Sequence, residues 1–168
     1  MMTSKNALPV GQPANVLIQP ELNPRQRILV VEDDAAIRRL NTEILTLSGY
    51  LVDAAEDGAA AWDALQLNNY DLIVTDNDMP KVTGVELIQK LQAVQRDLPV
   101  IMVTGIVPDE QLDRGGSLQT VVVLLKPYSF DELLGSVKSA LRAVTEGYGA
   151  MVPPPNWQIQ PLNNRFHL

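Results

Sequence analysis

Charged and hydroxyl side chains follow directly after apolar runs at several places in the sequence. Asp76 comes after LIVT and is followed two residues later by Asp78, and the acidic residues 32–34 come after ILVV. Thr104 ends the run VIMVT, and Lys126 comes after VVVLL. An aspartate at the end of an apolar run, with a second aspartate two residues on, is compatible with more than one kind of phosphate chemistry. These residue types therefore point to phosphate chemistry.

The apolar runs that must position these side chains have the composition of buried parallel strands. They span residues 28–31, 72–75, 100–104 and 121–125, and a weaker run at 50–54 is typical of an edge strand. Helical patterns separate the runs, and strands alternating with helices of this length predict βαβ units. We therefore expect an α/β fold with a doubly wound, five-stranded parallel sheet and helices on both faces.

Helix start signals support this alternation. Asp34 can cap the stretch AAIRRLNTEILTLSG, which ends at Gly49, and we interpret Asp34 as a cap and not as a site residue. Residues 83–86 (TGVE) and 129–132 (SFDE) have the spacing of a capping box. Ligands of such sheets bind beyond the carboxyl ends of the strands, so the side chains that follow the strands should converge on one edge.

Four motifs in this order resemble a known family. The pattern VVEDD, DLIVTDNDMPxxxG, PVIMVTG and LLKPYSFDEL is similar to the receiver domain of bacterial two-component response regulators, the CheY-like fold. The resemblance covers about residues 27–143 and implies the strand order 2-1-3-4-5. We expect a flexible N-terminal extension (1–25), a receiver domain (26–146) and a Pro-rich C-terminal tail (147–168).

The resemblance also implies an acceptor and metal site. Asp76 would be the phosphoryl acceptor, and Glu32 and Asp33 would form the acidic pair. Asp33 and Asp76 would hold Mg²⁺, with the backbone carbonyl of Asp78 as a further ligand. Mg²⁺ prefers hard oxygen ligands and keeps several waters, which agrees with this set of residues.

The resemblance also assigns a role in switching to two further residues. The hydroxyl of Thr104 would turn toward the phosphoryl group, and the ammonium of Lys126 would pair with that group. Val123 stands where receivers commonly carry Tyr or Phe, so we expect no swinging ring to propagate the change. Residues 105–120 contain Pro108 and a pair of glycines, which predicts a short or mobile helix that phosphorylation orders.

These features predict a single-domain response regulator in two-component phosphorelay signalling. It would accept a phosphoryl group on Asp76 from a histidine kinase or a phosphotransfer protein, and so switch its docking on another protein. We expect no enzymatic activity beyond self-catalysed phosphoryl transfer and slow autodephosphorylation.

Two alternatives stay open at this point. A pseudo-receiver would bind a partner without being phosphorylated, but it would not need the complete set of site residues. A haloacid-dehalogenase-type phosphohydrolase also carries Asp-x-Asp after an apolar strand, as in residues 76–78. In that family, however, the further acidic residues come later in the chain, whereas here residues 32–34 precede Asp76.

The composition of the chain disfavours some classes of partner and indicates where in the cell the protein is expected. The net charge of -7 and the pI near 4.6 disfavour direct binding to nucleic acid. The chain has no cysteine for disulfides or thiolate catalysis, and its single histidine, His167, lies in the tail. No apolar run approaches the roughly 20 residues of a membrane span, and the start of the chain lacks a signal-peptide core, so we expect a cytoplasmic protein. The short tail predicts stand-alone action, and the sequence also permits a homodimer.

Overall fold

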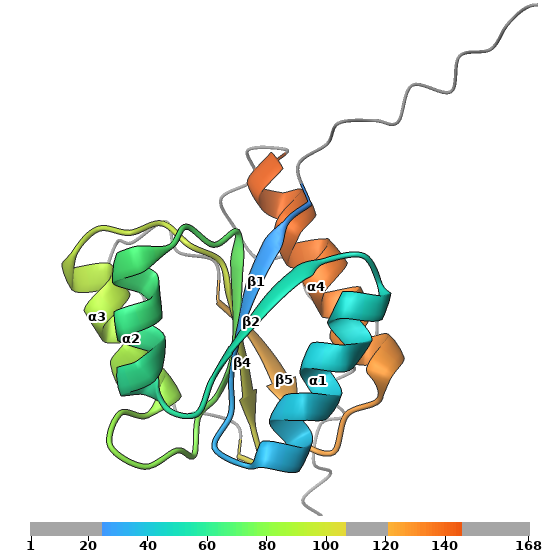
Figure 1. Cartoon of the computed structure of the whole chain (residues 1–168), viewed down its shortest axis with the longest axis horizontal. Helices are drawn as coiled ribbons and strands as arrows, with labels where there is room; N and C mark the ends of the chain where they lie inside the picture. Colours follow the sequence, from blue (N-terminus) through green and yellow to red (C-terminus); the bar gives the residue numbers. More distant parts are fainter. Residues whose placement is uncertain (1–24, 107–120, 146–168) are drawn as a thin grey trace, which may run out of the picture.

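The computed structural model describes residues 25–106 and 121–145. Within these ranges, five parallel strands form one sheet in the order β2-β1-β3-β4-β5 (Figure 1). The strands are β1 (Arg27–Val31), β2 (Leu51–Ala55), β3 (Leu72–Asp76), β4 (Val100–Thr104) and β5 (Val121–Leu125). The predicted strand order is confirmed, and every predicted strand boundary agrees within one residue.

Helices cover both faces of the sheet. Within the described ranges they are α1 (Ala35–Leu47), α2 (Gly58–Leu67), α3 (Gly84–Ala93) and α4 (Phe130–Thr145). Figure 1 shows α1 and α4 on one face and α2 and α3 on the other. Because successive strand residues point to opposite faces, Leu29 and Ile73 pack under α2 and α3, whereas Ile28 and Val74 pack under α1 and α4. The predicted doubly wound α/β architecture is therefore confirmed.

The helices begin at the predicted caps. The carboxylate of Asp34 accepts hydrogen bonds from the backbone N–H groups of Ala36 and Ile37, at 2.7 and 3.0 Å, and so starts α1. The capping box at residues 83–86 starts α3, and the same reciprocal bonds form at residues 129–132 ahead of α4. These bonds satisfy backbone donors that a helix start leaves without partners.

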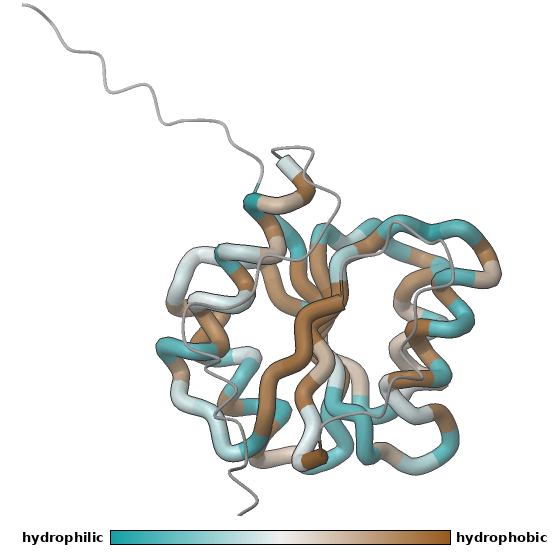
Figure 2. The backbone as a smooth tube through the Cα atoms, turned by 180° about the vertical axis from the view of Figure 1, so that it is seen from behind, coloured by the Kyte–Doolittle hydropathy of each residue, from teal (hydrophilic) through white to brown (hydrophobic). Residues whose placement is uncertain are grey.

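The strands differ in burial according to their place in the described sheet. β1, β3 and β4 are internal, and apart from Arg27 their residues are buried. The prediction that residues 121–125 form a buried strand was wrong, because Val121 to Leu124 are only partly buried and Leu125 is exposed. β5 is an edge strand that is paired with β4 alone, and Leu125 is 46% exposed. Figure 2 shows the apolar positions concentrated along the sheet, with hydrophilic positions on the outward turns of the helices.

Several predicted features lie outside the described residues. They are the N-terminal extension up to residue 24, the C-terminal tail, and the part of the weak helix that falls in residues 107–120. Val123 is described, and it packs against the apolar cluster under α2 and α3. No helix in the described ranges is long and apolar enough to cross a bilayer.

Candidate functional site

Three carboxylates converge at the carboxyl ends of β1 and β3. Because Val31 pairs with Thr75, the residues that follow these strands are neighbours at the sheet edge. One carboxylate oxygen from each of Glu32, Asp33 and Asp76 lies within 4.8 Å of the others. Glu32 and Asp76 are buried, whereas Asp33 is exposed, so the cluster is open to solvent on one side.

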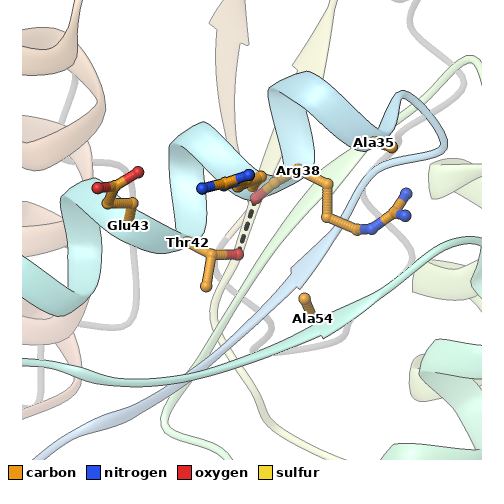
Figure 3. A pocket seen from close by; sticks show the side chains of 6 residues that line it. Ala35, Arg38, Thr42, Glu43 and Ala54 are labelled. Carbon is orange, nitrogen blue, oxygen red and sulfur yellow. Dashed lines mark hydrogen bonds between the residues drawn. The ribbon is translucent and has the colours of Figure 1, made fainter.

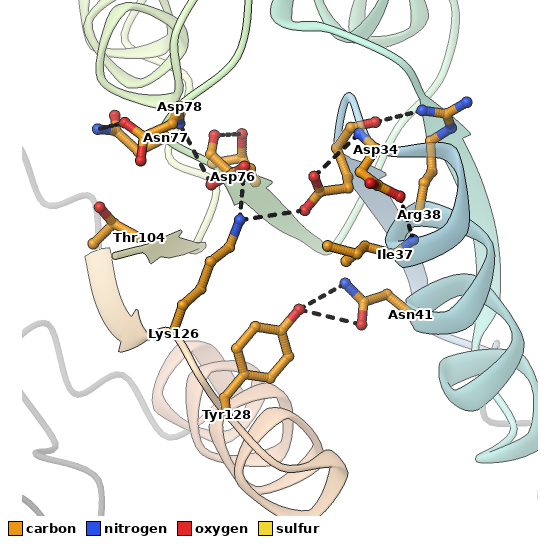
Figure 4. A network of polar contacts seen from close by, with 12 residues as sticks. Asp34, Ile37, Arg38, Asn41, Asp76, Asn77, Asp78, Thr104, Lys126 and Tyr128 are labelled. Atoms are coloured by element: carbon orange, nitrogen blue, oxygen red, sulfur yellow. Dashed lines mark hydrogen bonds and ion pairs between the residues drawn. The ribbon is translucent and has the colours of Figure 1, made fainter. Parts of the chain in front are cut away.

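The ammonium of Lys126 is the cation nearest to this acidic cluster in the described structure. Its Nζ donates to Oδ2 of Asp76 at 2.9 Å and lies 3.9 Å from Oε2 of Glu32 (Figure 4). The backbone N–H of Lys126 donates to the carbonyl of Thr104 at 2.9 Å, which continues the β4–β5 pairing and places the side chain at this edge. One ammonium therefore offsets only part of the negative charge of the cluster.

This excess charge shows in the acid–base behaviour of the site. The pKa of Glu32 is raised from 4.5 to about 7, first by burial and then by the charge of Asp76, while the charge of Lys126 opposes both. Burial alone would lower the pKa of Lys126, but the hydrogen bond to Asp76 and the charge of Glu32 outweigh burial and raise it. The cluster is thus short of positive charge at neutral pH.

The donor set fits a magnesium ion. Carboxylate oxygens are hard ligands, and the exposed side near Asp33 leaves room for the waters that Mg²⁺ retains. The carboxylate of Asp78 is not part of the cluster. Its backbone N–H instead lies 3.4 Å from Oδ1 of Asp76, which places the Asp78 backbone beside the Asp76 carboxylate. Receiver domains bind Mg²⁺ at an acidic site of this kind.

The hydroxyl of Thr104 is not directed at Asp76. Thr104 Oγ1 donates to the carbonyl of Ile106 at 3.1 Å and accepts from the N–H of Ile106 at 3.3 Å. Figure 4 shows the Thr104 side chain apart from the contact between Lys126 and Asp76. The structure therefore brings the predicted carboxylates and ammonium together, while the predicted hydroxyl is engaged within its own turn.

Sequence reasoning missed Arg38 on α1. Its Nη1 donates to the backbone carbonyls of Glu32 and Asp33, at 2.6 and 3.1 Å. Arg38 also lines a cavity of about 420 Å³ between α1 and β2 (Figure 3). That cavity contains none of the three clustered carboxylates. The only signal in the sequence was an arginine one turn after the Asp34 cap, which by itself says nothing about its partner.

A second missed pair joins the start of α2 to the loop between β3 and α3. Lys81 Nζ lies 2.5 Å from Oδ2 of Asp57, and the hydrogen bond from Lys81 is the largest cause that lowers the pKa of Asp57. Asp57 also caps α2 by accepting from the N–H of Ala60 at 2.8 Å. The loop is packed closely as well, since a Cβ on Gly84 would lie only 2.5 Å from the Asp76 carbonyl. The backbone next to Asp76 is therefore tightly enclosed.

A third missed contact lies beneath Lys126. The hydroxyl of Tyr128 accepts from Nδ2 of the buried Asn41 at 2.9 Å and donates to its Oδ1 at 3.3 Å (Figure 4). Burial raises the pKa of Tyr128. The pair ties the segment between β5 and α4 to α1. Its two residues are 87 positions apart, so no local pattern in the sequence could reveal it.

Comparisons with known proteins agree with this geometry. Residues 28–138 match the family model of the response regulator receiver domain. The chain is 35% identical over 126 residues to Response regulator MprA of Mycolicibacterium vanbaalenii, covering 74% of this chain and 54% of that protein. It is 31% identical over 116 residues to Transcriptional regulatory protein CusR of Escherichia coli, covering 69% of this chain and 51% of that protein. The chain thus spans about half the length of the curated relatives it matches.

Solved receiver structures are similar as well. Chemotaxis protein CheY4 of Vibrio cholerae has a TM-score of 0.62 at 27% identity, covering 69% of this chain and 98% of that one. Response regulator TrrA of Thermotoga maritima, solved in complex with Mg(2+)-BeF, has a TM-score of 0.59 at 33% identity, covering 68% of this chain and 98% of that one. On the matched residues, the strand order and the acidic edge, this chain belongs to the response regulator receiver domain family.

Proposed function

We propose that this chain is a phosphorylation-switched signalling protein in which Asp76 is the phosphoryl acceptor. The observation that carries the proposal is the position of the Asp76 carboxylate. It is buried, contacts Lys126 at 2.9 Å, and lies in one cluster with Glu32 and Asp33. Receiver domains are signalling proteins of two-component systems and not conventional enzymes, so a single covalent change at Asp76 is sufficient for this role.

The reaction follows from the groups present. An ionised Asp76 oxygen attacks the phosphorus of a phosphohistidine, the new O–P bond forms, and the N–P bond to the histidine breaks. The electron pair of that bond stays on the imidazole of the donor, which takes up a proton. No general base is needed, because the attacking carboxylate has no proton to lose. Catalysis of such a transfer consists mainly of positioning and of electrostatic stabilisation.

The acidic residues would hold Mg²⁺ beside the acceptor. Asp33 and Asp76 would supply carboxylate oxygens, Glu32 would complete the acidic group, and the backbone carbonyl of Asp78 would be the further ligand. When bound, the ion neutralises the charge that accumulates between the carboxylate and the incoming phosphoryl group. The burial of Glu32 and Asp76 supports this role, because buried carboxylates at one site need a compensating cation.

Lys126 and Thr104 would respond to the new phosphoryl group. Lys126 already contacts Asp76 and would pair with a phosphoryl oxygen after transfer. Thr104 would exchange its bonds to Ile106 for one to the phosphoryl group, which would change the turn that follows β4. Ile106 is 76% exposed and carries no polar group to orient a hydrolytic water, so the phosphoaspartate should be fairly long-lived.

The proposed partners follow from the family. Receiver domains interact with histidine kinases, and we infer that a kinase or a phosphotransfer protein is the donor here. The response would be altered docking on a further protein, in the cytoplasm, by a receiver unit of residues 26–146. Stand-alone action, homodimerisation and the absence of direct nucleic-acid binding stay predictions. The relatives extend well beyond the matched region, and one is named a transcriptional regulatory protein.

The experiment is an intact-mass measurement after incubation with acetyl phosphate and Mg²⁺. We expect one added phosphoryl group on the native chain and none on Asp76→Asn. The matched control is Asp78→Asn, which makes the same chemical change at a carboxylate outside the cluster and should still be phosphorylated. Omitting Mg²⁺ should prevent the reaction.

The outcomes separate the three functions considered. No adduct on a native chain that binds Mg²⁺ would favour the pseudo-receiver. Rapid consumption of acetyl phosphate that is lost in Asp78→Asn would favour the phosphohydrolase, which needs its second aspartate as acid and base. An adduct that persists on Asp76→Asn would show that another residue is the acceptor.

A further inference from the structure

The backbone of the segment that carries two of the clustered carboxylates is hydrogen-bonded by a side chain of α1. Glu32 and Asp33 follow β1 directly, and their backbone carbonyls both accept a hydrogen bond from Nη1 of Arg38. A guanidinium that bonds two successive carbonyls fixes the orientation of both peptide groups. The peptide orientation in turn decides where the carboxylates of Glu32 and Asp33 point.

Arg38 is itself held in place. Its backbone N–H donates to the carbonyl of Asp34, and its carbonyl accepts from Thr42 Oγ1, both at 2.8 Å. Side chains on a helix lean toward its N-terminus, so an arginine in the first turns of α1 reaches back over the preceding segment. The Asp34 cap fixes where α1 begins and therefore fixes this reach.

We propose that Arg38 is a positioning residue that sets the Mg²⁺ affinity of the site by orienting the Glu32–Asp33 segment toward Asp76. This inference rests on the proposed function, because it requires the acidic cluster to be the metal site. Arg38 donates to backbone carbonyls and not to the carboxylates, so it leaves the carboxylate oxygens free for the ion.

The charge of Arg38 makes the proposal sharply testable. A positive charge this close to the cluster repels a divalent cation, so its loss should tighten cation binding if charge is its only effect. Loss of the orienting bonds should weaken binding instead, and removing a group that orients metal ligands typically costs about tenfold or more in affinity. The sign of the change therefore separates positioning from electrostatics.

The chain contains a matched control in Arg39, the next residue on α1. Arg39 is exposed and makes no hydrogen bond to the Glu32–Asp33 segment in the described structure. Arg39→Gln removes the same charge from the same helix without touching those carbonyls. Its affinity should stay within about twofold of the native chain, with any change toward tighter binding.

The experiment is a titration of the full chain with Mn²⁺, in which electron paramagnetic resonance measures the free ion and added Mg²⁺ tests competition. Mn²⁺ shares the preference of Mg²⁺ for oxygen ligands. We expect Arg38→Gln to weaken binding about tenfold, while Arg39→Gln changes it little. Circular dichroism spectra establish that each variant is folded.

If Arg38→Gln does not fold, two variants that keep the charge, Arg38→Lys and Arg39→Lys, still test the proposal. Arg38→Lys retains the charge but replaces the planar guanidinium by an ammonium on a shorter and more flexible side chain, which holds the two carbonyls less firmly, so it should bind Mn²⁺ about threefold more weakly than Arg39→Lys. Equal affinities for these two variants, or tighter binding by Arg38→Gln, would overturn the role of Arg38. If the native chain binds no Mn²⁺ that Mg²⁺ displaces, or if Asp33→Asn binds it equally well, the proposed metal site fails and this inference fails with it.

Discussion

Two regions that border the site are held in very different ways. The acceptor loops, which we name after the proposed role of Asp76 and define as residues 32–34 and 77–83, are bonded by side chains from other elements. Arg38 on α1 bonds the first loop, and Asp57 at the start of α2 pairs with Lys81 in the second. Each acceptor loop is therefore fixed to a helix outside itself.

The Thr104 turn, which we define as residues 104–106, lacks such attachments among the described residues. The hydroxyl of Thr104 bonds only within the turn, a Cβ on Gly105 would meet no described atom within 4 Å, and Ile106 is 76% exposed. The contrast agrees with the proposed function. A charged site needs ligands that are already in place before the reaction, whereas a group that responds must be able to change partners at low cost.

The largest effect expected from this contrast concerns Glu32, which the first acceptor loop holds close to other carboxylates. Its folded-state pKa is about 7 against 4.5 in the unfolded chain, so the folded state binds the proton more tightly. The resulting stability is present below about pH 4.5 and is lost as the pH rises through about 7. In metal-free buffer, the free energy of unfolding should fall by on the order of 3 kcal/mol from about pH 5 to about pH 8.

Urea unfolding across this pH range, with a chelator present, measures the effect. Glu32→Gln should remove most of the slope and should be more stable than the native chain at about pH 8. His167 is the single histidine of the chain, so no other histidine contributes to the pH dependence of stability between about pH 5 and about pH 8. Thr104→Ser is the control from the Thr104 turn and should keep the native slope. A slope that persists in Glu32→Gln would contradict the prediction.

The second prediction compares Gly84, which directly follows the second acceptor loop, with Gly105 in the Thr104 turn. A Cβ on Gly84 would lie 2.5 Å from the Asp76 carbonyl and 3.0 Å from the Asn77 Cα, so Gly84→Ala must push the second acceptor loop away from β3. We expect it to lower the free energy of unfolding by about 2 kcal/mol. Gly105→Ala meets no described atom within 4 Å and should change it by less than about 0.5 kcal/mol.

Urea unfolding of both variants checks this comparison, and phosphorylation of Asp76 adds a second readout. Gly84→Ala should slow the reaction, because it displaces the backbone next to the acceptor carboxylate. Equal stability losses for the two alanine variants would mean that the acceptor loop is no more tightly packed than the Thr104 turn.

The third prediction compares two hydroxyl groups near Lys126. Tyr128→Phe removes the partner of Asn41, whose amide is only 3% exposed and cannot be hydrated in its place. The expected loss is about 1–2 kcal/mol. Thr104→Val removes a hydroxyl whose partners are both backbone groups of Ile106, a residue that is 76% exposed, so the loss should be smaller. Thermal unfolding of both variants measures the difference, and a larger loss for Thr104→Val would reverse the comparison.

The sequence predicted those features of the fold and site that depend on local signals. The strands are short apolar runs, the caps at Asp34 and residues 83–86 are short-range patterns, and the site residues follow directly after strands. The roles assigned to the individual site residues stay predictions. The three carboxylates and Lys126 lie together, whereas the Thr104 hydroxyl is bonded within its own turn.

The features that the sequence did not reveal depend on packing between distant segments. Asp57 and Lys81 are 24 positions apart, and which helix start meets which loop is decided only when α2 packs beside α3. The partial burial of β5 reflects its place at the sheet edge and not its composition, which is as apolar as that of β4. The direction of the Thr104 hydroxyl is a choice between local conformers, and no residue pattern encodes it.

The smallest expected effect concerns the pair of Asp57 with Lys81, and it tests whether the second acceptor loop is fastened at all. Lys81 is in a left-handed conformation at φ 66, and its side chain is largely exposed, so most of its own interaction with Asp57 is screened by solvent. Lys81→Gln keeps the backbone strain and removes only the charge. In a double-mutant cycle with Asp57→Asn, the combined loss of stability in urea should be less than the sum of the single losses, and the coupling should shrink in high salt.

Lys90→Gln is the matched control, because Lys90 stacks over Trp62 between α2 and α3 and does not contact the acceptor loops. Its effect should add to that of Asp57→Asn. Full additivity for Lys81→Gln as well would mean that close packing around Gly84, and not the ion pair, holds this loop in place.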